Sequence, residues 1–227
     1  MALPVHVGYI VDGNRRWAVA HGVDSFVGHR RGYEALKEVL IETLRCGVRY
    51  TSAYVFSTEN WNRPSREVNY LMNLFTRVLI DDIPVFIREN VRVKIVGSRE
   101  RLSKRVLRAI ERAESATAHL SGGDLLLCIN YGGQQEIVDA MRRIVAQAVT
   151  PEDVTETLVA RELYVPEVPA CDLIVRTSGE QRLSNFMLWR SAYSELLFLE
   201  KQWPDMTKND VPAILEEYTR RQRRFGG

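Results

Sequence analysis

The hydrophobic residues of this chain form short apolar runs that alternate with longer segments of helical periodicity. The runs predict buried strands at residues 5–11, 50–56, 91–96, 125–129 and 173–176, and residues 196–198 are interpreted as an apolar turn. Helices are predicted where apolar positions recur every three or four residues, at about 28–46, 64–90, 98–119 and 133–149, after 151, and from 207 onward. We expect Pro84 to bend the second of these helices.

This alternation of strands and helices predicts a parallel sheet with right-handed crossovers and helices on both faces. The chain contains no repeat, linker or low-complexity stretch, so residues 1–227 are expected to form one domain. A chain of this length buries about 70% of its unfolded surface, which supports a core without disulfides. Ligands of such a sheet bind beyond the carboxyl ends of its strands.

Three polar, arginine-bearing loops follow predicted strands, at residues 12–17, 57–63 and 176–185. Because the carboxyl ends of parallel strands face one crevice, these loops are expected to meet there. Arginine presents a planar fork of donors that matches phosphate oxygens, and the helix expected after Gly13 and Asn14 offers free backbone N–H groups. We therefore predict a crevice that binds two or more phosphates. Taken singly, each loop is also consistent with an ordinary turn or a solvated helix start.

Charge and composition limit the classes of function. The chain has 31 Lys and Arg residues against 29 Asp and Glu residues, and a net charge of +2 does not indicate a nucleic-acid-binding protein. The basic residues at 99–112 are interpreted as a solvated helix face. P-loop, dinucleotide-binding, nucleophile-elbow and H-E-x-x-H motifs are all missing. Cys46, Cys128 and Cys171 show no C-x-x-C spacing and are expected to be reduced core thiols.

The first residues lack the pattern of a signal peptide, and no window approaches the ~18 apolar residues of a membrane-spanning helix. We therefore expect a cytoplasmic protein that makes at most transient contact with a membrane.

Four sequence blocks resemble those of cis-prenyltransferases of the undecaprenyl diphosphate synthase family. They are the D-G-N-x-R-W-type loop at 12–17, F-S-x-E-N-W-x-R-P at 56–64, N-Y-G-G at 130–133, and the block from R-T to R-L-S-N-F at 176–186. The resemblance runs from His6 to Gly227 and includes W-P-D at 203–205 and R-R-F-G-G at the end.

The resemblance implies a single α/β domain with a central, mostly parallel six-stranded sheet flanked by helices and a hydrophobic tunnel. It also implies a Mg²⁺-dependent transferase that joins isopentenyl diphosphate to an allylic prenyl diphosphate and makes a new cis double bond. The simplest product is an undecaprenyl- or decaprenyl-type precursor of a carrier lipid. A homodimer is expected on the same grounds.

By this resemblance, Asp12 lies at the diphosphate and holds magnesium together with Glu195. The backbone of Gly13 and Asn14 and the side chain of Arg16 cradle the allylic diphosphate, assisted by His29. Further substrate-binding residues implied in the same way are Arg15, Trp17, Ser25, Ser57, Thr58, Glu59, Trp61, Arg63 and Leu183, and, for isopentenyl diphosphate, Arg176, Arg182 and Ser184. Arg224 and Gly226 reach over from a partner subunit.

Asn60 is the second residue assigned to catalysis, with Asp12, because the resemblance places it where the condensing carbon loses its proton. Asn60 is not a strong base. Our hypothesis is that the departing pyrophosphate takes the proton and that Asn60 orients it.

Three positions bear on the choice of substrate and product. Ser25 stands where the family usually has an arginine that contacts the allylic diphosphate, and one charge-assisted contact is worth about 1.5–3 kcal/mol. There are two explanations for this serine. Either the missing arginine contact is replaced by Arg15, Arg30 or Arg31, or the enzyme uses an unusual allylic substrate. Val55 is bulkier than the alanine common at that position and predicts a shorter product, whereas the small Gly123 predicts a longer one.

Two other functions stay open. One is a synthase of a short or irregular, branched cis-prenyl diphosphate for secondary metabolism, which Ser25 and Val55 favour. The other is a non-catalytic partner subunit of a prenyltransferase, which the intact set Asp12, Arg16, Asn60, Arg182 and Glu195 disfavours.

Overall fold

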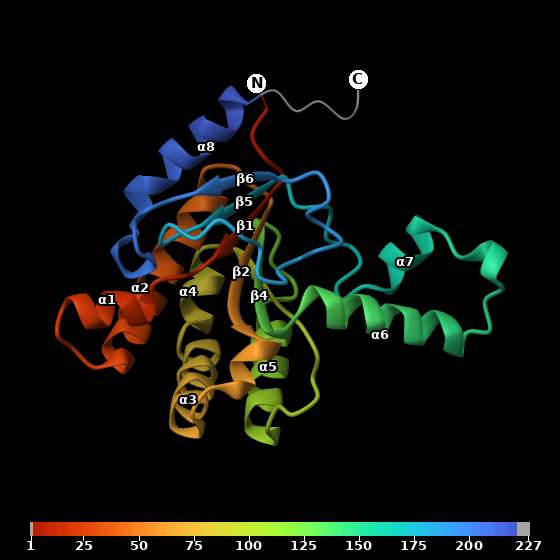
Figure 1. The fold of residues 1–227 in the computed structure, drawn as a ribbon, viewed down its shortest axis with the longest axis horizontal. Coiled ribbons are helices and arrows are strands. Elements are labelled where there is room, and N and C mark those ends of the chain that lie inside the picture. The colour runs from red at the N-terminus through yellow and green to blue at the C-terminus, as the bar shows by residue number, and fades with distance from the viewer. Residues whose placement is uncertain (1, 222–227) are drawn as a thin grey trace.

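The computed structural model describes residues 2–221 of the chain and contains, within that range, a single six-stranded sheet (Figure 1). Its strands are β1 His6–Ile10, β2 Tyr50–Ser57, β3 Val91–Val96, β4 Gly123–Tyr131, β5 Leu173–Arg176 and β6 Glu195–Phe198. They lie in the order β3-β4-β2-β1-β5-β6, and every neighbouring pair is parallel. The expected six-stranded sheet is confirmed, and it is entirely parallel.

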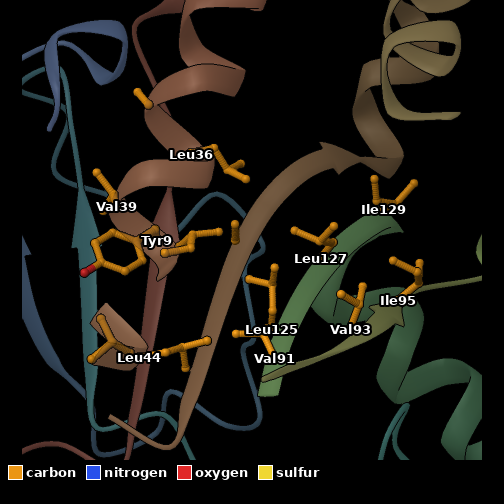
Figure 2. Close-up of a cluster of buried hydrophobic side chains, with 14 of the residues drawn as sticks. Tyr9, Leu36, Val39, Leu44, Val91, Val93, Ile95, Leu125, Leu127 and Ile129 are labelled. Atoms are coloured by element: carbon orange, nitrogen blue, oxygen red, sulfur yellow. The ribbon is translucent and has the colours of Figure 1, made fainter. Parts of the chain in front are cut away.

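The helices of the described chain are α1 Asn14–Ala20, α2 Ser25–Arg45, α3 Ser65–Asp81, α4 Ile83–Arg88, α5 Lys104–Thr117, α6 Gly133–Ala146, α7 Glu156–Glu162 and α8 Val211–Arg220. Apolar side chains of α2, α3, α4, α5 and α8 form one large core with one face of the sheet. Figure 2 shows part of this core, with Tyr9 of β1 beside Val39 of α2 and with Leu125 and Leu127 of β4 farther across the sheet.

No helix among residues 2–221 covers the second face of the sheet, contrary to the expectation of helices on both faces. Residues 164–187 supply most of its cover, including Val168, Phe186 and Met187, which are buried against Tyr54 and Cys128. The helices α6 and α7 instead extend away from the sheet (Figure 1). Outside the predicted strand at 173–176 this segment has no periodic apolar pattern, so the sequence offered no sign that it covers the sheet.

Two local expectations are refined by the structure. The predicted apolar turn is strand β6, an edge strand that pairs with β5 from Leu173↔Glu195 to Arg176↔Phe198. The helix expected to bend at Pro84 is interrupted at Asp82, and Pro84 occupies the first turn of α4. A proline in a first helical turn removes no hydrogen bond, because the N–H groups there have no partner within the helix.

All three cysteines carry free thiols, as expected, and Cys128 and Cys171 are fully buried. Burial raises the pKa of both thiols, that of Cys171 to about 12. Among residues 2–221 no helix is both long and apolar enough to cross a membrane.

The register of the central strands positions the polar loops. Ile10 at the end of β1 pairs with Tyr54 of β2 on one side and with Arg176, the last residue of β5, on the other. The loops that follow these three strands therefore emerge side by side at one edge of the sheet, as the sequence predicts.

Candidate active site

Asp12 lies between the loops that follow β2 and β5, and several backbone groups fix its position. Thr177 Oγ1 donates to the Asp12 carbonyl over 2.7 Å, and the Asp12 N–H donates back to the same hydroxyl over 3.1 Å. Gly13 follows with φ of 111°, and a side chain there would meet Ser178 Oγ at 3.0 Å and the backbone of Gln202 at 3.2 Å. Only glycine suits this turn, which directs the Gly13 N–H to Asp12 Oδ1 over 2.7 Å.

Arg176 is a buried arginine whose guanidinium joins three parts of the site. Its Nη2 donates to Asp12 Oδ2 over 2.9 Å, and its Nη1 donates to Ser184 Oγ over 2.8 Å and to the Arg182 carbonyl over 2.5 Å. Its side chain is only 5% exposed, and its Nε is buried without a hydrogen-bond partner. Ser184 has φ of 48°, so the loop adopts a sparsely populated conformation while it supplies these two acceptors.

The electrostatics of the site keep Asp12 ionised. Burial raises the pKa of the Asp12 carboxyl, but hydrogen bonds and charges from Arg176 and Arg16 together outweigh burial and hold that pKa below its ordinary value. Arg16 Nη2 lies 3.2 Å from Asp12 Oδ1. The carboxylate is therefore available as a charged oxygen ligand at neutral pH.

Two exposed arginines beside Asp12 are paired with one glutamate. Arg16 donates to Glu180 Oε1 over 3.0 Å and to the Ser178 carbonyl over 3.1 Å, and Arg182 donates to Glu180 Oε2. Their side chains are 46% and 59% exposed. Exposed ion pairs are weak, so both guanidinium groups can exchange Glu180 for a stronger anion such as a diphosphate.

The loop after β2 forms a 3₁₀ helix, Thr58–Asn62, that Ser57 and Asn60 close reciprocally as a capping box. Asn60 Oδ1 accepts from the Ser57 N–H over 3.2 Å. Glu59 accepts from Asn185 Nδ2 over 2.9 Å, which ties this loop to the loop after β5. Asn60 thus has a structural role in addition to any role in chemistry.

His29 is buried on α2 and is held by Glu67 of α3. The distance from His29 Nε2 to Glu67 Oε1 is 3.2 Å, and Arg63 Nη1 donates to the same oxygen over 3.0 Å. Burial lowers the pKa of His29 more than Glu67 raises it, so the imidazole is neutral at pH 7. Its single N–H then lies on Nε2 and donates to Glu67 Oε1, which leaves Nδ1 as an acceptor.

These loops enclose two polar pockets that meet. The first polar pocket is lined by residues 12–16, Val19, Ala20, His29, Asn60 and Arg63. The second polar pocket is lined by Asp12, Ser57, Glu59, Asn60, Arg63, Arg176, Ser184 and Asn185. Asp12, Asn60 and Arg63 border both, so two anions can bind on either side of one carboxylate and one amide.

An apolar cavity opens from the first polar pocket and runs between the sheet and helices α2 and α3. It shares Val11, Asn14, His29, Val55 and Leu71 with that pocket. Its other lining side chains are predominantly apolar: Leu36, Phe56, Met72, Leu74, Phe75, Val78, Leu127, Ile129 and Trp203, with Tyr33. Val55 lines both the first polar pocket and the apolar cavity. The prediction of a shorter product requires that this side chain face the cavity, and it does.

Several residues expected in the site support it from outside or lie elsewhere. Trp17 donates to Asp205 over 2.7 Å, Trp61 donates to Asn130 over 2.7 Å, and Leu183 packs against the core behind the sheet. Thr58 and Arg182 flank the two pockets without lining them. Ser25 begins α2, and its hydroxyl lies 3.5 Å from Asp24 Oδ1 outside both pockets. Arg224 and Gly226 lie outside the described residues.

Asp12 and Glu195, the two residues expected to hold magnesium, lie at different levels of the sheet within one chain. Glu195 pairs with Leu173 at the amino end of β5, whereas Asp12 follows the carboxyl end of β1 beside Arg176. Three residues of strand, about 10 Å, separate those two levels. The Glu195 carboxylate accepts instead from Arg221 Nη1 over 3.1 Å. The register of an edge strand, which a single sequence does not reveal, decides this outcome.

Sequence reasoning missed two residues of the site. Asn185 lines the second polar pocket and bonds Glu59, and its place in the polar loop at 176–185 was the available signal. Glu67, which orients His29, could not be recognised from the sequence. A glutamate four residues after an arginine is common on ordinary helices.

Asp12 is suited to magnesium, although it is the lone carboxylate common to the two pockets. No group of three or more potential metal-ligating side chains occurs among residues 2–221. Magnesium is commonly held by one or two carboxylates, with substrate phosphates and water completing its octahedron. An ionised carboxylate between two anion pockets fits that pattern.

An arginine-rich pair of anion pockets that opens into an apolar cavity defines a site for amphipathic diphosphates. Comparison with known proteins agrees. The family model described as "Putative undecaprenyl diphosphate synthase" matches residues 10–226. An isoprenyl transferase of Thermotoga maritima is 45% identical over 229 residues, covering 100% of this chain and 98% of that protein. An isoprenyl transferase of Listeria innocua is 43% identical over 231 residues, covering 100% and 92%.

Two solved structures extend the comparison. Lavandulyl diphosphate synthase from Lavandula x intermedia, in complex with dimethylallyl diphosphate, superposes with a TM-score of 0.96 at 32% identity, covering 99% of each chain. A probable undecaprenyl diphosphate synthase from Campylobacter jejuni superposes with a TM-score of 0.85 at 29% identity, covering 100% of each. The chain belongs to the undecaprenyl diphosphate synthase family and is, at that level, a prenyltransferase.

Proposed function

We propose that the protein condenses isopentenyl diphosphate with an allylic prenyl diphosphate and releases a cis-polyprenyl diphosphate and pyrophosphate. The observation that carries this proposal is the pair of polar pockets that meet at Asp12 and Asn60, one of which opens into an apolar cavity. An enzyme for this reaction must bind two diphosphates and one hydrocarbon tail at the same time.

The allylic substrate occupies the first polar pocket. The α1 N-terminus after Gly13, with Arg15 and Arg16, binds its diphosphate, and His29, whose N–H Glu67 accepts, lines the same pocket. The hydrocarbon tail enters the apolar cavity past Val55 and Leu71. Isopentenyl diphosphate occupies the second polar pocket at Arg176 and Ser184, with Arg182 released from Glu180 to bind it.

The reaction breaks the allylic C–O bond and forms a C–C bond between the two substrates. The allylic carbon becomes electron-deficient as pyrophosphate leaves, so stabilising the departing negative charge lowers the barrier. Arg16 and the α1 N–H groups supply part of that stabilisation, and magnesium, which Asp12 would hold, would supply Lewis-acid chemistry there. The condensing carbon then loses a proton to pyrophosphate, which Asn60 orients.

The length of the product distinguishes two candidates. The family model and the Campylobacter jejuni structure, both described as undecaprenyl diphosphate synthases, support an undecaprenyl- or decaprenyl-type carrier lipid precursor. A short or branched product is supported by the superposition on lavandulyl diphosphate synthase and by Val55, which narrows the entrance of the apolar cavity. A non-catalytic partner subunit is disfavoured because Asp12 and Asn60 border both pockets and Arg176 holds Asp12 in place.

We also propose a cytoplasmic homodimer. The outward helix α6 exposes Val138, Met141 and Val145, which recur along one side of the helix and are 45%, 37% and 73% exposed. A second copy that covers this stripe removes it from water. Light scattering of the purified protein at micromolar concentration tests the dimer directly.

The central test is turnover. Purified protein is incubated with labelled isopentenyl diphosphate, Mg²⁺ and, in turn, dimethylallyl, geranyl and farnesyl diphosphate, and dephosphorylated products are resolved against length standards. Turnover that EDTA abolishes and Mg²⁺ restores supports the proposal. Absence of turnover with every primer, from a protein that is folded by circular dichroism, contradicts it.

A further inference from the structure

The helices α2 and α3 run side by side in the same direction away from the polar pockets, and charged pairs connect them at successive levels. The His29–Glu67 pair lies at the pockets, and Lys37 Nζ contacts Asp82 Oδ1 at 3.2 Å farther along. Arg45 of α2 then contacts Glu89, just beyond α4, at 2.7 Å. The apolar cavity occupies the interval between the first and second pairs.

The lining residues of both helices end close to the Lys37–Asp82 pair. On α2 the lining positions farthest from His29 are Tyr33 and Leu36, and on α3 the farthest is Val78. Lys37 and Asp82 follow Tyr33 and Val78 by four residues each, which places them on the same helix faces one turn farther on. The pair therefore lies directly below the end of the cavity.

On the side of the sheet, the cavity ends at about the same depth as it does on the two helices. Leu127 and Ile129 of β4 line it, whereas Leu125, two residues earlier on the same face, does not and is buried in the core. Figure 2 shows Leu36 on α2 near Leu127 and Ile129, with Leu125 and Leu44 farther along in the same direction. A side chain at Gly123 would meet Leu44 Cδ2 at 2.8 Å, so Leu44 already fills the space that the small glycine leaves.

Two buried polar atoms without partners mark this end of the cavity. They are the hydroxyl of Tyr33 and Oδ2 of Asp82. Both side chains surround one ammonium group, because Lys37 Nζ lies 5.5 Å from the Tyr33 ring centroid as well as 3.2 Å from Asp82. An alkyl tail cannot hydrogen-bond to either orphan atom, and it would have to separate the ion pair to pass.

We propose that Tyr33, backed by the Lys37–Asp82 ion pair, stops the growth of the prenyl chain and makes this protein a short-chain synthase. The inference rests on the proposed prenyl transfer. From His29 to Lys37 the helix rises about 12 Å. An isoprene repeat of four bonds of about 1.5 Å spans at most about 5 Å, so two to three repeats fit beyond the diphosphate. The expected product therefore has about two to three isoprene units.

Product length in variants tests the assignment. Tyr33→Ala opens the end of the cavity and is expected to add at least one isoprene unit to the main product. The double variant Lys37→Met/Asp82→Leu replaces the charged pair with apolar side chains of similar size and is expected to add units as well. Tyr33→Phe retains the ring and removes only the hydroxyl, so its products should match those of the wild type. Glu34→Ala changes an exposed residue of the same helix and serves as the control.

The outcomes separate this inference from the proposed function. Long, carrier-length products from the wild type, or an unchanged distribution in both Tyr33→Ala and the double variant, overturn the inference and leave prenyl transfer standing. If the wild type shows no turnover, unreactive thiodiphosphate analogues of increasing tail length still test the cavity by calorimetry. Affinity should rise by about fourfold for each CH₂ group buried and then level off at about two to three units. A rise that continues to longer tails overturns the inference.

Discussion

Arg176 Nη2 lies 2.9 Å from Asp12 Oδ2, so the buried guanidinium at the end of β5 supports the carboxylate that borders both polar pockets. The parallel pairing of Ile10 with Arg176 brings the two residues together, although 164 positions separate them in the chain. The same guanidinium also bonds Ser184 and the Arg182 carbonyl. One side chain thus orders the carboxylate and the loop of the second polar pocket before any substrate binds.

Replacement of Arg176 by lysine should impair binding of isopentenyl diphosphate and shift the pH dependence of the reaction. Lysine is a point charge and cannot bond Asp12, Ser184 and Arg182 at once, so KM for isopentenyl diphosphate should rise about 10-fold or more. Arg176 helps to hold the pKa of Asp12 below its ordinary value. With weaker support that pKa rises, a smaller fraction of Asp12 is ionised in acid, and activity should be lost at a higher pH.

Steady-state kinetics between about pH 5 and pH 9 measure both effects. Arg77→Lys, a matched change at an exposed position of α3, is the control and should leave both parameters unchanged. An Arg176→Lys protein with wild-type KM and an unshifted acid limb would show that Arg176 acts only in folding.

The fold and the location of the site were predictable because each depends on short-range patterns. Continuous apolar runs located the five strands other than β6, and the alternation with helices implied that Asp12, Asn60 and Arg176 share one edge of the sheet. Burial on both faces makes such strands conspicuous in sequence. The motifs at their ends then identified the family.

What the sequence did not reveal depends on long-range packing. β6 is an edge strand of partly exposed residues, so it lacked the apolar run of a buried strand, and its register separates Glu195 from Asp12. The contacts of Arg176 with Ser184 and the Arg182 carbonyl require a loop with positive φ at Ser184. A serine in the sequence does not indicate a positive φ. The orphan hydroxyl of Tyr33 likewise becomes visible only when α2 is packed against α3.

Asn60 should affect turnover through two effects that different substitutions separate. Asn60→Ala removes both the group that orients pyrophosphate and the cap that Asn60 Oδ1 provides to the Ser57 N–H. Asn60→Asp retains a capping oxygen, so stability should be preserved, but it adds negative charge between two anion pockets. We expect kcat to fall about 10- to 100-fold in Asn60→Ala and KM for both diphosphates to rise in Asn60→Asp.

Rate measurements at saturating substrate, paired with thermal unfolding, distinguish the effect of Asn60 on turnover from its effect on stability. An Asn60→Ala protein with unchanged kcat would remove the assignment of proton orientation to this residue. If Asn60→Ala loses only stability and activity recovers at lower temperature, the cap alone is its function.

Introduction of arginine at position 25 tests whether the chain compensates for Ser25. Ser25 begins α2 outside the first polar pocket, and an arginine there has the reach of a long side chain that serine lacks. If no other residue compensates, Ser25→Arg should lower KM for the allylic diphosphate about 10- to 100-fold, the equivalent of one charge-assisted hydrogen bond.

The matched control for that variant is Ser25→Gln, which adds length without charge. Kinetics with geranyl and farnesyl diphosphate at low and high salt give the comparison. An unchanged KM in Ser25→Arg would indicate that Arg15 or the arginines beside His29 already bind the diphosphate fully.

His6 should make the free energy of unfolding depend on pH in the acid range. The imidazole is fully buried, its Nδ1–H donates to the Pro169 carbonyl over 3.1 Å, and its Nε2 then accepts from Ser52 Oγ over 2.6 Å. Burial lowers the pKa of His6 from 6.5 to about 4. Between these values the unfolded chain binds a proton that the folded chain does not, so stability is fully present above pH 6.5 and decreases as the pH falls toward 4.

The expected loss from His6 between about pH 7 and pH 4.5 is about 2–3 kcal/mol, since each unit of pKa difference is worth about 1.4 kcal/mol. Urea unfolding at both pH values measures it, and His6→Asn, which retains an amide donor toward Pro169, is the comparison. The variant should be less stable at pH 7 yet lose less stability on acidification. His29, whose pKa burial also lowers, contributes in the same direction in both proteins, so some slope should persist in the variant. If the two proteins lose equal free energy between these pH values, His6 is not the group that titrates.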